Sequence, residues 1–178
     1  MRHALDTLYR TAGWLAALCL LAILVLVALQ VGARILDWGL TAAGLTATRF
    51  SIPALAEIGG FLLGASTFLA LAETLAKNVH IRVDLLTTRL PDKPRKIVDG
   101  IAALVGAALA AFATYALAAL AYKSFSYGDV SYGMVAIPLA LPQGCLAVGL
   151  LVFTIALLDE AMLAFSGQDR IVGEGAGI

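Results

Sequence analysis

Four long apolar runs constrain the fold of this chain more than any other feature. Residues 11–33 contain no charged side chain, and as a helix these 23 residues span about 34 Å. The hydrocarbon core of a bilayer is about 30 Å thick, so this run is long enough to cross it. Apolar residues make up 61% of the chain and charged residues 13%. The sequence therefore predicts an all-α integral membrane protein.

The ends of the spans are set by charges and prolines. Pro138 and Pro142 divide the last uncharged run, so the fourth span is placed after the first of them. The first run is longer than the apolar part of a signal peptide and lacks a clear cleavage motif, so we expect it to be retained. We predict one membrane domain over residues 1–178 with a flexible glycine-rich tail at 166–178. The predicted spans are 12–34, 54–76, 97–122 and 138–160.

The connection between the second and third spans has an amphipathic pattern. Its apolar residues recur at helical spacing, and its polar residues share another face. This pattern predicts an interfacial helix at residues 79–90, parallel to the membrane surface; a solvated basic loop is the alternative. The residues assigned to this helix include Val79, His80, Arg82, Val83, Asp84 and Leu86.

The distribution of Lys and Arg predicts the orientation. Nine of these residues lie in the N-terminal segment, the middle connection and the tail, whereas three lie in the first and third connections. Cytoplasmic loops carry the excess of positive charge. We therefore predict that both termini are cytoplasmic.

Two acidic residues mark the ends of the second span. An acid inside a membrane helix is a candidate site for ions or protons, but each of these two has a local cation. Lys77 lies four residues after Glu73, and Arg34 is expected at the same membrane face as Glu57, with Arg49 as a rival partner. We predict a structural ion pair between Arg34 and Glu57 in preference to an ion-transport site.

Small residues at four-residue spacing predict close helix packing. Such residues let neighbouring backbones approach closely within a membrane. Gly60 and Gly64 form such a pattern in the second span, and Gly106 and Ala110 form one in the third. We predict that these four residues lie at helix interfaces.

Other classes of site have little support in the sequence. His3 and His80 lie outside the uncharged runs, so two spans offer no pair of haem ligands. Cys19 and Cys145 lie within apolar runs, where an inert buried thiol is the usual state. No nucleophile or phosphate-binding motif is present, and the net charge of zero implies no nucleic-acid partner. We predict no catalytic residue, metal site or cofactor, and no enzymatic activity.

Several features follow one another in a fixed order along the chain. They are Arg34 closing the first span, Glu57 opening the second, His80-Ile81-Arg82-Val83-Asp84, Leu90-Pro91 before the third span, and Ile137-Pro138 before the fourth. In this order they resemble the small membrane subunit, DctQ-like, of tripartite ATP-independent periplasmic (TRAP) transporters. The resemblance covers about residues 14–162, although the connection after Arg34 is longer than usual and lacks the customary Trp before the acid.

The resemblance implies a multi-pass protein of the bacterial inner membrane with two protein partners. One is a large membrane subunit, which carries the sodium and substrate sites of the family, and the other is a periplasmic substrate-binding protein. The small subunit would brace the first, within membrane lipid, and help dock the second during sodium-driven uptake of an organic acid. Two alternatives stay open: a membrane anchor of a quinone-linked enzyme, which haem absorbance would reveal, and a small stand-alone carrier, which uptake by this chain alone would reveal.

Overall fold

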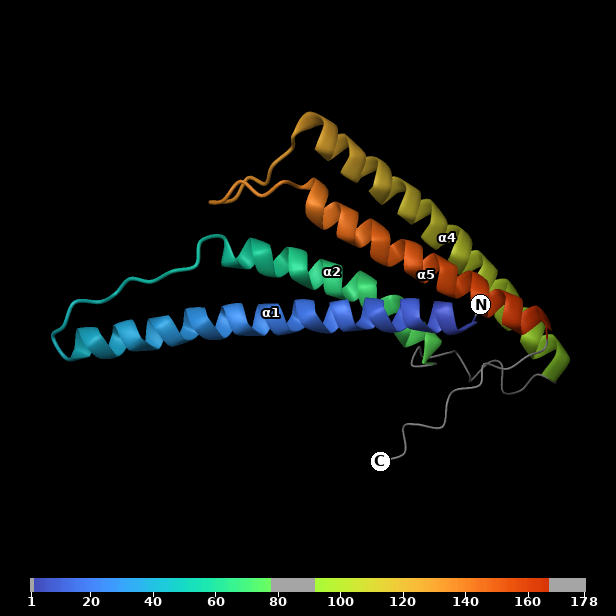
Figure 1. Ribbon diagram of the computed structural model, residues 1–178, viewed down its shortest axis with the longest axis horizontal. Coiled ribbons are helices and arrows are strands. Elements are labelled where there is room, and N and C mark those ends of the chain that lie inside the picture. Colours follow the sequence, from blue (N-terminus) through green and yellow to red (C-terminus); the bar gives the residue numbers. More distant parts are fainter. Residues whose placement is uncertain (1, 78–91, 167–178) are drawn as a thin grey trace, which may run out of the picture.

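The computed structural model describes residues 2–77 and 92–166, and this part of the chain is helical apart from its connections. All four helices are long and apolar enough to cross a membrane. Figure 1 shows them as α1 (Arg2–Ala42), α2 (Leu55–Ala76), α4 (Asp92–Tyr127) and α5 (Ala140–Ser166). The predicted interfacial helix at 79–90 and the predicted tail after Ser166 lie outside the described residues.

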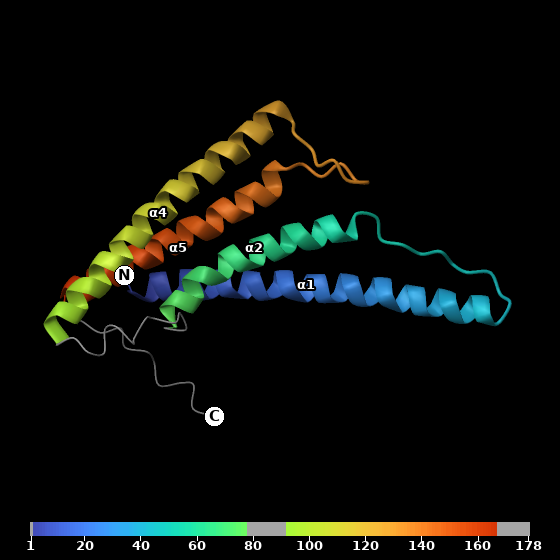
Figure 2. The same cartoon turned by 180° about the vertical axis from the view of Figure 1, so that it is seen from behind.

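The helices form two antiparallel pairs that meet through α5. α1 packs against α2, α4 packs against α5, and α5 also packs against α2 and, over a smaller area, against α1. The start of α1 and the end of α5 lie at the same end of the bundle, which we call the N-terminal end (Figures 1 and 2). From there α1 and α4 diverge toward the opposite end, where the α1–α2 and α4–α5 connections lie; we call it the distal end.

Three helices, α1, α4 and α5, continue past the predicted ends of their spans, and α5 ends at Ser166 instead of residue 160. The prediction ended the first span at Arg34, but α1 continues to Ala42; α4 likewise passes residue 122 and ends at Tyr127. Both stop at a glycine with a positive φ angle, Gly44 (75°) and Gly128 (67°). The hydrogen bonds after each helix are those of a Schellman motif: Leu45 N–H donates to Leu40 O, and Asp129 N–H donates to Ser124 O, both at 2.9 Å. Hydropathy shows where a span leaves the lipid, whereas these glycines determine where the helix ends.

The α1–α2 connection is bound back onto α1 by two polar side chains. Asp37 accepts hydrogen bonds from the backbone N–H groups of Thr48 (2.7 Å) and Arg49 (2.9 Å). Two turns earlier on the same face of α1, Gln30 accepts one from the N–H of Ile52 at 2.8 Å. These bonds satisfy backbone donors that have no helical partner. The connection therefore runs along α1 rather than as a free loop.

The buried core consists mainly of alanine, in two clusters. One joins α1, α2 and α5, and the other joins α4 to α5. Because small side chains line both, the helix backbones approach closely, as is common between membrane helices. The buried members are Tyr9, Ala12, Ala16, Leu69, Ala72, Val152 and Ala156 in the first cluster, and Ala107, Ala110, Leu150 and Leu157 in the second.

One close backbone approach between helices involves Gly149 of α5. A Cβ atom at this position would lie 2.8 Å from the carbonyl carbon of Phe68 and 2.9 Å from the backbone nitrogen of Leu69, both in α2. A Cβ added at Gly144, on the same helix, would meet no atom within 4 Å. Gly149 therefore allows α2 and α5 to pack backbone against backbone.

Candidate partner-binding surface

Glu57 lies in the first turn of α2, at the distal end of the bundle. An acid at this position interacts favourably with the helix dipole. Its Oε2 atom is buried and has no hydrogen-bond partner among the described residues. The carboxylate lies against Gly133 of the α4–α5 connection, where an added Cβ would overlap it. Glu57 therefore contacts the connection between the other two spans.

The structure does not bring Arg34 and Glu57 together as an ion pair. Arg34 is exposed on α1, and the carboxylate of Glu57 lies against Gly133 instead. The structure also shows no salt bridge from Glu57 to its rival partner, Arg49, whose backbone N–H binds Asp37. The helix dipole of α2 gives Glu57 an electrostatic reason for its position without a cation.

This geometry predicts that Arg34 and Glu57 act independently. Changing each to Gln, alone and together, should give additive changes in the free energy of unfolding, within about 0.5 kcal/mol. The double-mutant cycle is measured by SDS titration of the helix content of the protein in mixed micelles. A coupling energy well above that limit would restore the ion pair predicted from the sequence.

The second acid, Glu73, forms the i, i+4 ion pair that its spacing predicts. Its Oε1 atom lies 2.6 Å from Nζ of Lys77. The same carboxylate covers Gly13 of α1, where an added Cβ would overlap it. Glu73 therefore has a structural role at the α1–α2 contact, near the N-terminal end of the bundle.

The four predicted packing residues differ in their surroundings. A Cβ at Gly64 would lie 3.6 Å from Leu146 of α5, and one at Gly106 would lie 3.6 Å from Leu157 of α5. Ala110 is buried between α4 and α5. Gly60 is exposed, with no atom near enough to contact a Cβ. Three of the four small residues therefore face α5, and the fourth, Gly60, faces open space.

The threonine hydroxyls at the α4–α5 contact bind backbone carbonyls of their own helices. Thr114 of α4 donates to the carbonyl of Ala110, and Thr154 of α5 donates to that of Leu150, each at 2.8 Å. The two hydroxyl oxygens also lie 3.4 Å apart across the α4–α5 contact. Among the described residues, no group of three or more His, Cys, Asp or Glu side chains could hold a metal ion.

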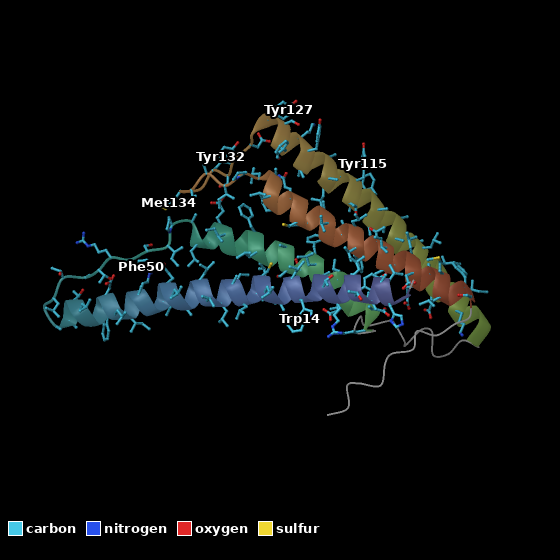
Figure 3. The ribbon with its side chains drawn as sticks, in the orientation of Figure 1. Trp14, Phe50, Tyr115, Tyr127, Tyr132 and Met134 are labelled. Atoms are coloured by element: carbon cyan, nitrogen blue, oxygen red, sulfur yellow. The ribbon has the colours of Figure 1, made fainter. Side chains whose placement is uncertain are left out.

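The outer faces of α1 and α4 are apolar and uncovered. In the most apolar 18-residue stretch of each helix, the share buried within the chain is 11% in α1 and 17% in α4. The corresponding share in the central helix α5 is 33%. Figure 3 shows Trp14 and Tyr115 pointing away from the bundle. The large exposed side chains of α4 include Leu109, Phe112, Tyr115, Tyr122 and Phe125. These faces require lipid or another protein to cover them.

The α4–α5 connection, residues 128–139, is a short folded loop. Val130 and Pro138 form an antiparallel bridge. The Ser131 hydroxyl donates to Val135 O at 3.1 Å within the tip. Tyr132 and Met134, which flank Gly133, are almost fully exposed, and Figure 3 shows them at the tip of the loop, beyond the start of α5. No sequence motif marked Tyr132 and Met134 as a surface.

Four membrane-length helices with exposed apolar faces define a multi-pass helical membrane protein. Comparison with known families matches residues 39–167 to the DctQ component of tripartite ATP-independent periplasmic transporters. The chain belongs to this family, whose members are components of transporters. The match begins near the end of α1, after Arg34, and continues just past the end of α5. Searches of curated proteins and of solved structures found no match.

Proposed function

We propose that this protein is the small membrane subunit that braces the large transport subunit of a TRAP transporter in the bacterial inner membrane. It also helps dock the periplasmic substrate-binding protein during sodium-driven uptake of an organic acid. The observation that carries the bracing role is the apolar surface of α1 and α4, of which the chain itself covers a small share. Membership of the DctQ family supports the presence of partner subunits.

The interior of the bundle supports bracing rather than transport by this chain. The alanine-rich core holds the helices close together, and the Thr114 and Thr154 hydroxyls bind backbone carbonyls of their own helices. Glu73 binds Lys77, and Glu57 lies in the first turn of α2, away from the middle of its span. This arrangement suits a fixed support for a subunit that moves. Gly60 is proposed as a position where a partner helix approaches α2, and residues 79–90 as an interfacial helix.

A co-purification experiment tests the bracing role. A tagged form of this chain, expressed with the large subunit, should retain it through size-exclusion chromatography in mild detergent. Replacing Phe112 and Tyr115 with Ala removes apolar area from the exposed face of α4, so the retained fraction should fall several-fold if this face contacts the large subunit. A wild-type chain that never retains the large subunit would contradict the proposal.

The proposed orientation places both termini in the cytoplasm and the distal end of the bundle in the periplasm. Single cysteines are introduced after Cys19 and Cys145 are changed to Ser. Thr46 and Ser126, both exposed near the distal end, should react with a membrane-impermeant thiol reagent added to intact cells. Thr7, exposed in the first turns of α1, should react only after the cells are opened. The reverse labelling pattern would overturn this topology.

A further inference from the structure

We propose that the α4–α5 loop, residues 128–139, is the surface on which the periplasmic substrate-binding protein docks, and that Glu57 holds the loop in place. This inference rests on the proposed function, including its orientation. It adds a defined surface, two contact residues and one positioning residue.

The loop has a defined shape without a partner. Its two arms are joined by backbone hydrogen bonds from Ser131 N–H to Ile137 O (2.9 Å) and from Leu139 N–H to Asp129 O (3.0 Å). Ser131 is buried, so its N–H bond to Ile137 is protected from water. A loop that is ordered before binding loses less conformational entropy when a partner binds.

The chain itself makes little use of the side chains at the tip. Tyr132 is fully exposed, and Met134 is 88% exposed. Figure 3 shows both beyond the start of α5. Tyr and Met are enriched in protein interfaces, where an aromatic ring provides a large contact area with few rotatable bonds. The tip therefore presents apolar contact groups on a rigid base.

The position of the tip favours a water-soluble partner over lipid. The predicted span ends at residue 122, and α4 continues for about 8 Å to Tyr127 before the loop begins. Lys123 and Asp129 lie between that point and the tip. The tip therefore lies beyond the hydrocarbon core, on the proposed periplasmic side. The tripartite family to which the chain belongs provides a periplasmic component for this surface.

The charges of the distal end also fit contact through apolar side chains. Three basic residues are balanced there by three acidic residues. An interface with an apolar centre and a mixed polar rim is the common arrangement between proteins. The charged residues are Arg34, Arg49, Lys123, Asp37, Glu57 and Asp129.

Glu57 determines where the tip lies relative to α2. Gly133, between the two exposed contact residues, lies directly against the Glu57 carboxylate. Changing Gly133 to Ala would displace the carboxylate from the loop and so remove this support without removing a contact side chain. Glu57 is therefore a positioning residue, and Tyr132 and Met134 are the contact residues.

The test uses the complex of this chain with the large subunit in lipid nanodiscs, titrated with the purified binding protein. Changing Tyr132 and Met134 together to Ser should weaken binding by about tenfold or more. Gly133→Ala should weaken it by a smaller factor. A matched control changes Leu45 and Phe50 to Ser; these are exposed apolar residues of the α1–α2 connection at the same end, and their replacement should leave Kd within about twofold.

The amount of large subunit in each nanodisc preparation separates the two claims. A wild-type preparation without the large subunit overturns the proposed function, and this inference with it. Loop variants that keep the large subunit and bind the binding protein as tightly as wild type overturn the docking surface alone. Loop variants that lose the large subunit assign the tip to the membrane-subunit interface, which also overturns the docking surface. A loss of binding in the control pair instead would move docking to the α1–α2 connection.

Discussion

Replacing Gly149 with Val is expected to separate α2 from α5 and to give a large loss of stability. The new side chain would meet the backbone of Phe68 and Leu69, which cannot move aside as a flexible side chain can. Overpacking of this kind costs about 1–3 kcal/mol, and a contact with backbone belongs at the upper end. Because α2 and α5 join the two helix pairs, the loss should affect the whole bundle.

Gly144→Val is the matched control for this prediction. It makes the same chemical change on the same helix, but into open space. SDS titration of helix content in mixed micelles should show a large loss of unfolding free energy for Gly149→Val and a small change for Gly144→Val. Equal effects from the two substitutions would mean that the close α2–α5 contact does not exist in the membrane.

The fold class could be predicted from the sequence because uncharged length is a strong physical constraint. In lipid, a helix satisfies the backbone N–H and C=O groups of each of the four apolar runs. The described residues contain four helices of membrane length. The helix ends were harder to predict, because α1 continues past Arg34 until Gly44 allows a left-handed turn. Charge marks the lipid boundary, whereas backbone hydrogen bonding marks the end of a helix.

The helix contacts were predicted in part. The pattern of small residues at four-residue spacing indicated Gly64, Gly106 and Ala110, which meet α5. It missed Gly149, because Phe153 breaks the pattern four residues later. An isolated glycine within a run of large aliphatic residues was the available signal, since such a glycine often has a packing role.

The position of Glu57 could not be predicted from local sequence. Arg34 was the nearest cation by topology, but the carboxylate lies against Gly133, which is 76 residues later in the chain. A contact of this kind depends on how the two helix pairs meet. The spacing between Glu73 and Lys77, by contrast, lies within one helix, and the structure confirms that pair.

Omitting this protein from a reconstituted transporter is expected to abolish uptake, which is the second large effect that the account predicts. If the chain braces the large subunit, then the large subunit and the binding protein together should lack a stable support for the transport motion. The chain alone should also be inactive, because its own acids lie in the first turn of α2 and in an ion pair with Lys77. Uptake should therefore require all three components.

Uptake into proteoliposomes therefore tests the central claim most directly. Vesicles are prepared with this chain alone, with the large subunit alone and with both, and each is assayed with the binding protein, a labelled organic acid and an inward sodium gradient. The account predicts uptake only in vesicles that hold both membrane subunits, and only with binding protein present. Sodium-dependent uptake by vesicles that contain this chain alone would contradict it and would identify the protein as a carrier.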